Sequence, residues 1–436
     1  MIDVVADTQV VVLMGGLGTR LGLKDRPKAM ADVNGVPFFD YQLRLLKRWR
    51  FHKFLFLVGY QARQIEAYYG DGSQRQVNIQ YSYDGPVPQG TGGALKQAEE
   101  KLEDDFLLLY GDSFMDIDYQ ETVYRYRLAK AAGKSGLMTV LKNRNEFDKS
   151  NVIFQNGEIL LYDKRNYQTE MQYIDYGVSM LSKSVLVDFN PGQRFDLADI
   201  LTPLSQRNRL AAQIVTKRFY EIGTPTSLQE FREYSKARFD HKQKAVFFDR
   251  DGVINELVFQ EASEQLDSPF RQENFHYRPH VLQTLRQLQQ RGFYLFTVTN
   301  QPAAAKGKTS LSKLYDLNTW MVQDLKAKGI TIEFSSLCPH HPNGTPQNKK
   351  ARFLIQDCVC RKPKPGMITD LLQVYNIDLT CSFMVGDSYT DISAGKQAGL
   401  KTVLLGNWKC DICQALEGNR PDAVIQDIAA LIQIVE

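Results

Sequence analysis

The sequence contains no apolar run of the roughly 18 residues that a membrane-spanning helix needs. Its amino terminus also lacks the positive charge of a signal peptide, because Asp3 and Asp7 stand there, and Gly15 and Gly16 soon end the apolar stretch. Long runs of like charge are missing too, and the net charge of the 436 residues is +3. Proteins that bind nucleic acids concentrate basic residues on one surface. We therefore expect a cytoplasmic protein that binds neither a membrane nor a nucleic acid.

Cysteine is absent from the first half of the chain, and all six cysteines lie in the second. Because a reducing cytoplasm disfavours disulfides, this uneven distribution indicates metal ligation. Two Cys/His pairs stand about twenty residues apart and supply four ligands, the number that closes a tetrahedral Zn²⁺ site. The predicted zinc ligands are Cys338, His340, Cys358 and Cys360.

The alternative to zinc ligation is that these residues are small buried hydrophobes. A closed four-ligand site leaves no open position for chemistry, so we expect the zinc to be structural. His341 is expected at the surface or against a substrate, and Cys381 in the core. Cys410 and Cys413 are expected near a surface turn and unrelated to the metal, with a redox pair or an additional metal site as the alternatives.

The chain is too long for one ordinary core, and two domains of roughly 200 residues are the natural expectation. Both halves alternate short apolar strands with amphipathic helices, which predicts mostly parallel sheets with helices on both faces. A basic, polar stretch precedes a fresh apolar strand at 245–248. We therefore predict an α/β protein with two doubly wound, Rossmann-like domains at 1–238 and 243–436.

The strand and helix boundaries follow from the same patterns. The expected strands are 9–14, 54–58, 106–110, 245–248, 294–299, 382–386 and 402–405. The expected helices are 38–49, 225–238, 279–291, 311–328, 367–375 and 389–398. The segment 135–181 is richer in strand-forming residues, which predicts an antiparallel extension of the first sheet.

A glycine-rich loop follows the first expected strand, with Gly15, Gly16, Gly18 and Thr19 before Arg20, and Lys28 farther on. Glycines let the backbone approach a polyphosphate with its N–H groups turned inward, and the two basic residues would offset the phosphate charge. The alternative is a tight strand-to-helix turn with solvated basic residues. A dinucleotide fingerprint needs glycine where Leu21 stands, and a Walker A loop needs Gly-Lys-Ser/Thr, so neither fits.

Other segments of the first half extend this predicted phosphate site. A second glycine-rich turn, with Gln89, Gly92 and Gly93, enters a helix and suits contact with a base or ribose. Asp112 and Glu221 follow strands at the edge where ligands of open sheets collect, so they predict a Mg²⁺ site. Three residues are candidates for binding a sugar and its phosphate, namely Lys164, Asp175 and Gly177.

The second half carries two aspartates, Asp249 and Asp251, directly after a buried apolar strand. Carboxylates in this position are costly unless something binds them; a turn with a capping Asp is the alternative. Polar residues farther along the chain are candidates for the same site as these two aspartates. They are Thr299, Asn300, Arg361, Lys362, Asp387 and Asp391.

Residues 8–235 resemble the nucleoside-diphosphate-sugar pyrophosphorylases, through the Gly-Gly-x-Gly-Thr-Arg-Leu…Pro-Lys signature. Within that family the Gly90–Ala94 segment is similar to the heptose-1-phosphate guanylyltransferases. The resemblance implies a GT-A-like fold in which a sugar-1-phosphate oxygen attacks the α-phosphorus of a nucleoside triphosphate and expels pyrophosphate.

The same resemblance implies a role for each candidate residue of the first half. Arg20 and Lys28 would stabilise the developing charge, Asp112 and Glu221 would hold Mg²⁺, and Lys164 would bind the sugar phosphate. The family usually has Asp where Glu221 stands, and the longer side chain would shift the ion.

Residues 244–433 resemble the haloacid-dehalogenase (HAD) superfamily of phosphatases, whose four motifs match in order. The resemblance implies that Asp249 forms an aspartyl-phosphate and that Asp251 protonates the leaving oxygen and then deprotonates water. Thr299 and Lys362 would bind the phosphoryl group. Asp249, Asp387 and the Asp251 carbonyl would hold Mg²⁺, with Asp391 orienting them. An acid must carry a proton, so we predict a raised pKa for the Asp251 carboxyl group.

The zinc loop together with Cys-Arg-Lys-Pro is similar to the heptose-bisphosphate 7-phosphatases, and histidinol-phosphate phosphatases share the layout. Two departures, the 301–307 loop and Ser388, lie where substrate would bind. The two resemblances imply consecutive steps, because the phosphatase product is the acceptor of the guanylyltransferase. The partners are then small molecules, a nucleoside triphosphate and sugar phosphates. The alternatives are another base or sugar, or a decayed, sugar-nucleotide-binding regulatory protein.

Overall fold

The computed structural model describes residues 3–16, 18–23, 25–85, 87–261, 264–346, 349–406 and 420–435, and of Thr19 the backbone alone. The expectation for Cys410 and Cys413 lies outside the described residues. The chain divides into two compact units, Met1–Ala237 and Arg238–Glu436. Among the described residues, no helix has the length and apolar character needed to cross a bilayer.

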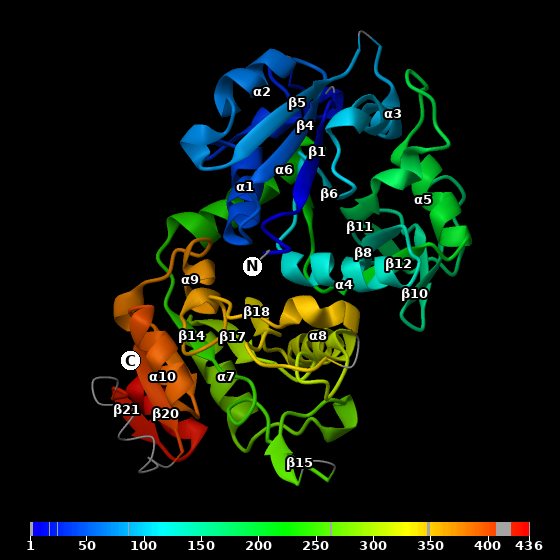
Figure 1. Cartoon of the computed structure of the whole chain (residues 1–436). Coiled ribbons are helices and arrows are strands. Elements are labelled where there is room, and N and C mark those ends of the chain that lie inside the picture. Colours follow the sequence, from blue (N-terminus) through cyan, green and yellow to red (C-terminus); the bar gives the residue numbers. More distant parts are fainter. Residues whose placement is uncertain are drawn as a thin grey trace. The chain divides into compact units, whose positions relative to one another are not determined.

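A mixed sheet forms the centre of the first unit, and nine of the described strands belong to it. The path runs β10-β9-β11-β6-β1-β4-β5, with β8 beside β11 and β12 beside β8. In Figure 1 the blue strand β1 lies between β4 and β6. The strands are β1 (Gln9–Met14), β4 (Lys53–Val58), β5 (Asn78–Tyr83), β6 (Asp105–Tyr110), β8 (Gly136–Lys142), β9 (Val152–Gln155), β10 (Glu158–Tyr162), β11 (Tyr173–Ser182) and β12 (Leu210–Val215).

Six helices and two small strand pairs complete the described part of the first unit. The helices are α1 (Phe38–Arg48), α2 (Ala62–Tyr69), α3 (Gly90–Gln97), α4 (Tyr119–Ala131), α5 (Leu197–Gln206) and α6 (Pro225–Ser235). The pairs are β2 (Asp32–Val33) with β3 (Val36–Pro37), and β7 (Ser113–Phe114) with β13 (Tyr220–Glu221).

Strand β1 shows why this sheet is covered on both faces. All its residues are buried, and it pairs in parallel with β4 and β6. Because side chains alternate along a strand, Val11 and Leu13 pack into the core beneath α3 and α5. On the other face Phe56 of β4 packs edge-to-face against Phe39 of α1, with ring centroids 5.4 Å apart. The predicted doubly wound arrangement is confirmed.

The predicted antiparallel extension is also present. Strand β11 pairs antiparallel with β6, β8 and β9, and β10 pairs antiparallel with β9. Strand β12, which the sequence patterns did not predict, adds to β8 in parallel. The extension lengthens the sheet edge beyond β6, where Asp112 follows the strand.

The second unit has a parallel sheet, in which the described strands follow the order β18-β17-β14-β19-β20-β21. These strands are β14 (Ala245–Phe248), β17 (Tyr294–Asn300), β18 (Phe334–Cys338), β19 (Phe383–Gly386), β20 (Lys401–Leu405) and β21 (Ala423–Ile425). A separate hairpin pairs β15 (Val258–Gln260) with β16 (Gln265–Asp267). The described helices are α7 (Val281–Gln290), α8 (Leu311–Ala327), α9 (Gly366–Leu372), α10 (Tyr389–Gln397) and α12 (Leu431–Ile434).

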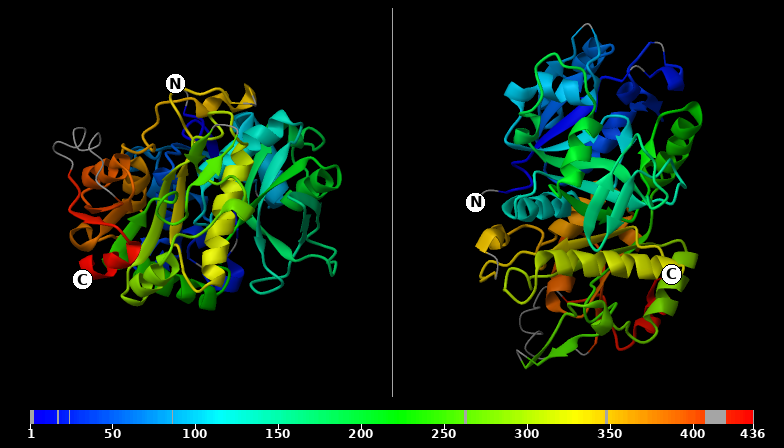
Figure 2. Two further views of the ribbon diagram at one scale, coloured as in Figure 1. Left: turned by 90° about the horizontal axis from the view of Figure 1, so that it is seen from below. Right: turned by 90° about the vertical axis from the view of Figure 1, so that its right-hand side faces the viewer.

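Both faces of the second sheet are covered as well. Val246 and Phe248 of β14 face a core that includes residues of α7, α8 and α12, and Figure 2 shows the yellow helix α8 running along the sheet. Phe247 points to the opposite face, where its ring stacks on Phe296 of β17 at 4.8 Å. Tyr375 then packs edge-on against Phe296, also at 4.8 Å.

Most expected boundaries agree with the structure to within one or two residues, and two helices are shorter than expected. Helix α6 ends at Ser235, and a wider turn over Lys236–Asp240 replaces its predicted continuation to 238. Helix α9 ends at Leu372, where the expectation was 375. Tyr375 instead turns inward to pack on Phe296.

The stacked Phe296 provides a test of this core. Replacing Phe296 with Ala removes a fully buried ring and leaves a cavity between Phe247 and Tyr375. We expect the free energy of unfolding of the second unit to fall by about 3–5 kcal/mol, measured by urea denaturation. The control Val424→Ala truncates a side chain that is 45% exposed, so its free energy of unfolding should stay within about 0.5 kcal/mol of the wild-type value. Equal, small effects of both changes would contradict the packing described.

Candidate functional site: two strand-end carboxylate sites and a Cys/His cluster

The first unit has two adjoining cavities at the carboxyl ends of its parallel strands. The larger measures about 430 Å³ and the smaller about 250 Å³. Lys28, Tyr110 and Asp112 line both cavities, so these residues mark the junction. Ligands of open α/β sheets bind at this edge, and a bipartite cavity suits two ligands that react with each other.

Two ion pairs bring together the predicted catalytic and metal-binding residues of the first unit. Lys28 Nζ lies 2.9 Å from Asp112 Oδ2, and Arg20 Nη2 lies 3.9 Å from Glu221 Oε1. Burial raises the pKa of Glu221, with Asp112 adding to the rise and Lys28 and Arg20 opposing it. Two carboxylates facing two cations are well placed to hold a divalent cation and an anionic ligand.

The first glycine loop lies where the sequence predicts a phosphate cradle. Gly15 and Gly16 line the smaller cavity. Gly18 has a φ of +66°, and a Cβ built there would lie 3.3 Å from Lys28 Cγ, so glycine lets Lys28 pack against the loop. Arg20 follows in a short 3₁₀ turn, with its side chain 73% exposed.

The second glycine turn is only partly at the cavity. Gly90 and Thr91 line the smaller cavity, and Gln89 precedes the first residue of α3. Gly92 and Gly93 are not in the cavity lining. A Cβ on Gly92 would lie 2.3 Å from the Phe195 ring, and one on Gly93 would lie 2.9 Å from the Gln193 carbonyl. These two glycines therefore let α3 approach the segment before α5.

Lys164, Asp175 and Gly177 all line the larger cavity, as expected for a sugar-phosphate site. The Gly177 N–H donates to Asp175 Oδ1 at 2.9 Å, and Gly177 has a φ of +95°, a conformation that favours glycine. Burial raises the pKa of Asp175, against the opposing effect of Lys164. This cavity is therefore lined by both acidic and basic groups.

Sequence reasoning missed several residues that line these cavities. Asn151 accepts a hydrogen bond from the Asp175 N–H at 2.9 Å, and Asp148 and Tyr167 stand nearby in the larger cavity. Tyr110 precedes Asp112 on β6, and its buried phenol has a raised pKa. Of these residues, Tyr110 could have been found from the sequence, because it is an aromatic residue at the end of an apolar strand. Asp148 and Asn151 belong to a polar loop whose sequence has no pattern that indicates a site.

In the second unit the predicted carboxylates converge at the ends of β14 and β19. Ligand oxygens of Asp249, Asp387 and Asp391 all lie within 4.8 Å of one another. Lys362 Nζ lies 2.8 Å from Asp249 Oδ1 and 2.6 Å from Asp391 Oδ1. The Lys362 side chain is only 2% exposed and Asp391 is fully buried, so each charge needs the other as its counter-charge.

Two glycines make this convergence possible. A Cβ on Gly252 would lie 2.0 Å from Asp387 Oδ2, and Gly252 has a φ of +81°. A Cβ on Gly386 would lie 2.1 Å from Asp391 Cβ. Any side chain at either position would push a carboxylate away from the cluster.

Asn300 and Thr299 lie beside the same cluster. Asn300 donates from its side-chain amide to the Lys362 carbonyl at 3.0 Å and accepts from the Lys362 N–H at 3.1 Å, so it fixes the lysine backbone. The buried Thr299 hydroxyl accepts a hydrogen bond from Gln301 Nε2 at 2.9 Å. Arg361 donates to the His340 carbonyl at 3.2 Å, which links the lysine segment to the cysteine-rich loop.

The predicted rise in the pKa of Asp251 is wrong. Burial raises the pKa of this carboxyl group, but Arg250 and hydrogen bonds from Ser268 and Gln301 together hold it below its ordinary value. The Arg250 guanidinium donates twice, at 3.1 Å each, and Ser268 Oγ donates at 2.7 Å. Ser268 lies seventeen residues away along the chain. Neither its approach nor the inward turn of Arg250 is visible in the sequence pattern.

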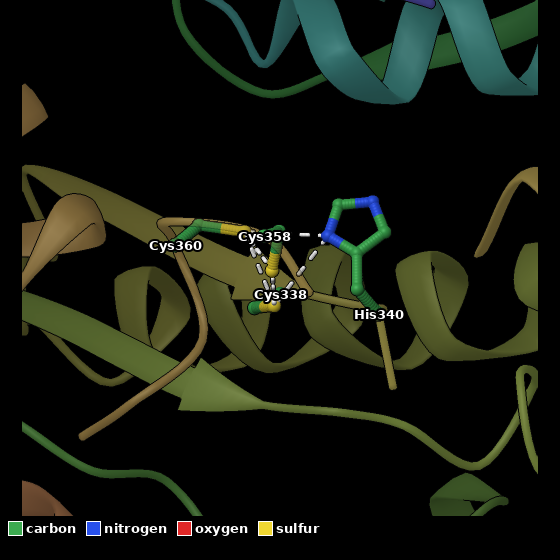
Figure 3. Close-up of side chains that lie close together, drawn as sticks. All are labelled: Cys338, His340, Cys358 and Cys360. Carbon is green, nitrogen blue, oxygen red and sulfur yellow. Dashed lines mark hydrogen bonds between the residues drawn. The ribbon is translucent and has the colours of Figure 1, made fainter. Parts of the chain in front are cut away.

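The four predicted zinc ligands form one buried cluster (Figure 3). The sulfur atoms of Cys338, Cys358 and Cys360 lie 3.1–3.5 Å apart, and His340 Nδ1 lies 3.3 Å from Cys360 Sγ. Hydrogen bonds from Cys338 and Cys360 lower the pKa of Cys358, whereas burial raises that of Cys338. Four soft or borderline donors converging at these separations form a candidate metal centre.

Comparison with known proteins agrees with this geometry. Residues 9–237, more than half of the chain, match the family model described as nucleotidyl transferase. Residues 359–431 match the model described as HAD-hydrolase-like. Over 159 residues the chain is 36% identical to the D-glycero-beta-D-manno-heptose-1,7-bisphosphate 7-phosphatase of Rhodopseudomonas palustris, with 36% of this chain and 81% of the relative covered. The chain belongs to the nucleotidyl transferases and, in its second unit, to the HAD-like sugar phosphatases.

Two solved structures are similar to the separate units. HddC from Yersinia pseudotuberculosis is 24% identical, with a TM-score of 0.44, and the match covers 52% of this chain and 99% of that one. The D,D-heptose 1.7-bisphosphate phosphatase from B. bronchiseptica, complexed with magnesium and phosphate, is 28% identical. Its TM-score is 0.36, and the match covers 44% of this chain and 97% of that one.

The protein is therefore an enzyme with a nucleotidyl transferase unit and a phosphatase unit. Enzymes of both families generally use Mg²⁺, and the donor sets fit it, since oxygen ligands from carboxylates are those that Mg²⁺ prefers. In the phosphatase unit Asp249 and Asp387 would hold the ion beside Lys362. In the transferase unit Asp112 and Glu221 would do so.

Metal binding in the phosphatase unit should depend on pH in a defined direction. Without metal, burial raises the pKa of Asp249 to about 7 and that of Asp387 to about 6. Both values exceed the ordinary 3.8, so folding favours the protonated forms. The stability that these groups contribute is present at acid pH and is lost as the pH rises through about 6 to 7.

We predict that Mg²⁺ raises the thermal unfolding midpoint of the phosphatase unit more at pH 8 than at pH 5. At pH 5 the ion must displace protons from both carboxyl groups, whereas at pH 8 both are already ionised and bind the ion without losing a proton. Calorimetry with and without Mg²⁺ at both pH values measures the difference. Asp387→Asn should remove most of it. An equal shift of the midpoint at both pH values in the wild type would contradict the assignment.

Proposed function

We propose that the protein carries out two consecutive steps on one heptose. The phosphatase unit removes the 7-phosphate of heptose 1,7-bisphosphate. The transferase unit then joins GMP from GTP to the resulting heptose 1-phosphate and releases pyrophosphate. The observation that carries this proposal is the presence of both units in one chain, because removal of the 7-phosphate, the activity for which the relatives are named, leaves a sugar 1-phosphate. That is the acceptor class expected beside Lys164 and Asp175.

In the transferase unit, the 1-phosphate oxygen attacks the α-phosphorus of GTP and the bond to the β-phosphate breaks. Lys28 and Arg20 offset the charge that develops on the triphosphate, while the Gly15–Gly16 backbone lies along it. Asp112 and Glu221 hold Mg²⁺, which supplies further charge compensation. Lys164 binds the phosphate of the acceptor. Catalysis of this kind depends on positioning, and no covalent intermediate is needed.

In the phosphatase unit, Asp249 attacks the phosphorus of the 7-phosphate and the sugar oxygen leaves with a proton from Asp251. Asp251 then takes a proton from the water that hydrolyses the aspartyl-phosphate. The ion pair with Arg250 favours the ionised carboxylate of Asp251, which suits its role as the base that takes a proton from water. To protonate the leaving sugar oxygen, Asp251 must first gain a proton from the incoming phosphate monoester. Lys362 and Thr299 stabilise the transferred group.

The metals and boundaries complete the proposal. Zn²⁺ occupies the Cys338, His340, Cys358 and Cys360 cluster, where it is structural because all four positions are taken by protein ligands. The domains extend over 1–238 and 243–436, and the protein acts in the cytoplasm on small-molecule substrates.

One incubation tests the whole proposal. Full-length protein with heptose 1,7-bisphosphate, supplied as each anomer, GTP and Mg²⁺ should yield GDP-heptose, inorganic phosphate and pyrophosphate. Asp249→Asn should block product from the bisphosphate by about a thousandfold or more and leave product from heptose 1-phosphate unchanged. Lys28→Ala should block formation of GDP-heptose from either substrate and leave phosphate release unchanged, so heptose 1-phosphate should accumulate. Each variant is thereby the control for the other.

Three results would contradict parts of the proposal. Phosphate release without any sugar nucleotide would refute the coupling. Faster hydrolysis of histidinol phosphate, or transfer from another nucleoside triphosphate, would change the substrates. No turnover in either unit would favour a regulatory protein that binds sugar nucleotides.

The zinc assignment has its own test. Cys358→Ser removes one of four ligands, so the zinc content measured by elemental analysis should fall from about one per chain to well below half. Phosphatase activity should fall with it, because the cluster holds the loop that joins Arg361. The control Cys381→Ser changes a cysteine outside the cluster and should retain both. Full zinc content in Cys358→Ser would refute the ligand set.

A further inference from the structure

Asp84 lies in the smaller cavity of the transferase unit, and neither ion pair of that site includes it. It directly follows β5, and its backbone N–H donates to the Val58 carbonyl at 2.8 Å. The cavity lining places it with Gly15 and Gly16, whose loop lies along the triphosphate in the proposed function. The same cavity has apolar walls, formed by Leu13, Leu57, Pro88 and Ala94, which suit the flat faces of a base.

The carboxylate of Asp84 is held close to two backbone segments that leave room for it. A Cβ on Gly15 or on Gly59 would lie 2.7 Å from Asp84 Oδ2. The carboxylate therefore lies against the backbone that directly follows β1 and β4. Any side chain at either glycine would displace it.

No described residue donates a hydrogen bond or an ion pair to this carboxylate. Burial raises the pKa of Asp84, and no other group in its surroundings opposes that rise. The two other acids of the cavity differ from it, because Asp112 is paired with Lys28 and Asp196 begins α5 in a capping box with Asp199. A half-buried carboxylate without a donor is costly, and a ligand with donors would offset that cost.

The chemistry of the four bases identifies such a ligand. Guanine presents two adjacent donors, N1–H and N2–H, on one edge. Adenine and cytosine present one amino group beside a ring acceptor, and uracil presents one N–H between two carbonyls. A carboxylate has two acceptor oxygens and no donor, so it pairs bidentately only with guanine.

We propose that Asp84 selects the nucleotide by accepting N1–H and N2–H of guanine, one at each carboxylate oxygen. This assignment deepens the proposed function, which gives the transferred group as GMP, and rests on nucleotide binding in the smaller cavity.

Binding of nucleotides in the absence of any sugar phosphate tests the assignment on the full-length protein with Mg²⁺. The probes are GTP, inosine triphosphate and ATP, measured by isothermal titration calorimetry. Inosine triphosphate keeps N1–H and lacks only the N2 amino group. We expect the wild type to bind GTP about tenfold more tightly than inosine triphosphate, since one charge-assisted hydrogen bond is lost. ATP should bind more weakly still.

Asp84→Asn keeps the size of the side chain and supplies only one acceptor. We expect its affinity for GTP to fall by about tenfold or more and the preference for GTP over inosine triphosphate to narrow to about threefold or less. Asp196→Asn is the comparator, because it changes an acid of the same cavity that is outside the ion pairs of the site, and it should keep the wild-type preference for GTP over inosine triphosphate. The unfolding midpoint of Asp84→Asn should not fall, because the change removes an unpaired buried charge.

Each other outcome has a separate meaning. Equal binding of GTP and inosine triphosphate by the wild type would overturn the assignment without any variant. A uniform loss for all three nucleotides in Asp84→Asn would overturn it in favour of a contact with ribose or a packing role. Tight binding of GTP with an unchanged preference in the variant would also overturn it. If the wild type bound no nucleoside triphosphate, the proposed function itself would fail.

Discussion

A buried lysine held between two aspartates organises the phosphatase unit. Lys362 lies within 2.8 Å of carboxylate oxygens of Asp249 and Asp391, and all three side chains are largely withdrawn from water. Burial alone would lower the pKa of Lys362, but the two carboxylates raise it, so the lysine stays charged. Removing Lys362 would leave two buried carboxylates without a counter-charge, which is strongly destabilising. The rest of the site depends on this pairing, since Asn300 fixes the lysine backbone and Asp387 completes the carboxylate cluster.

The transferase unit uses the same principle with less burial. Lys28 and Asp112 form an ion pair of 2.9 Å at the end of β6, with side chains 14% and 23% exposed. A more accessible pair suits a cavity that must admit a triphosphate, because an incoming anion competes for the lysine. Glycines at the strand ends make both sites possible. Gly252 and Gly386 admit the phosphatase carboxylates, while Gly15 and Gly59 admit Asp84.

The strand ends and the residues that follow them were predictable from sequence because local pattern determines them. Strand β1 begins at Gln9 and ends at Met14 as expected, and the four residues predicted to bind zinc form one cluster, as their spacing suggests. The environment of each side chain was less predictable. Burial raises the pKa of Asp251, but Arg250 lowers it, and Ser268 and Gln301, both distant in sequence, lower it further by donating hydrogen bonds. Gly92 and Gly93 appear in a motif of the phosphate site, yet they serve helix packing, since Phe195 approaches from another segment. Asp84 carried no motif, and only the folded cavity shows that it lacks a partner.

We propose that Asp249, at the end of β14, and the buried Lys362 paired with it bind and activate a phosphoryl group. A crystal structure of the full-length protein with Mg²⁺ and orthovanadate, which imitates the transferring phosphoryl group, tests it most directly. We expect vanadium within bonding distance of an Asp249 carboxylate oxygen, Lys362 in contact with the vanadate oxygens, and a metal ion between Asp249 and Asp387. Vanadate bound elsewhere, with Lys362 still enclosed by Asp249 and Asp391, would contradict it.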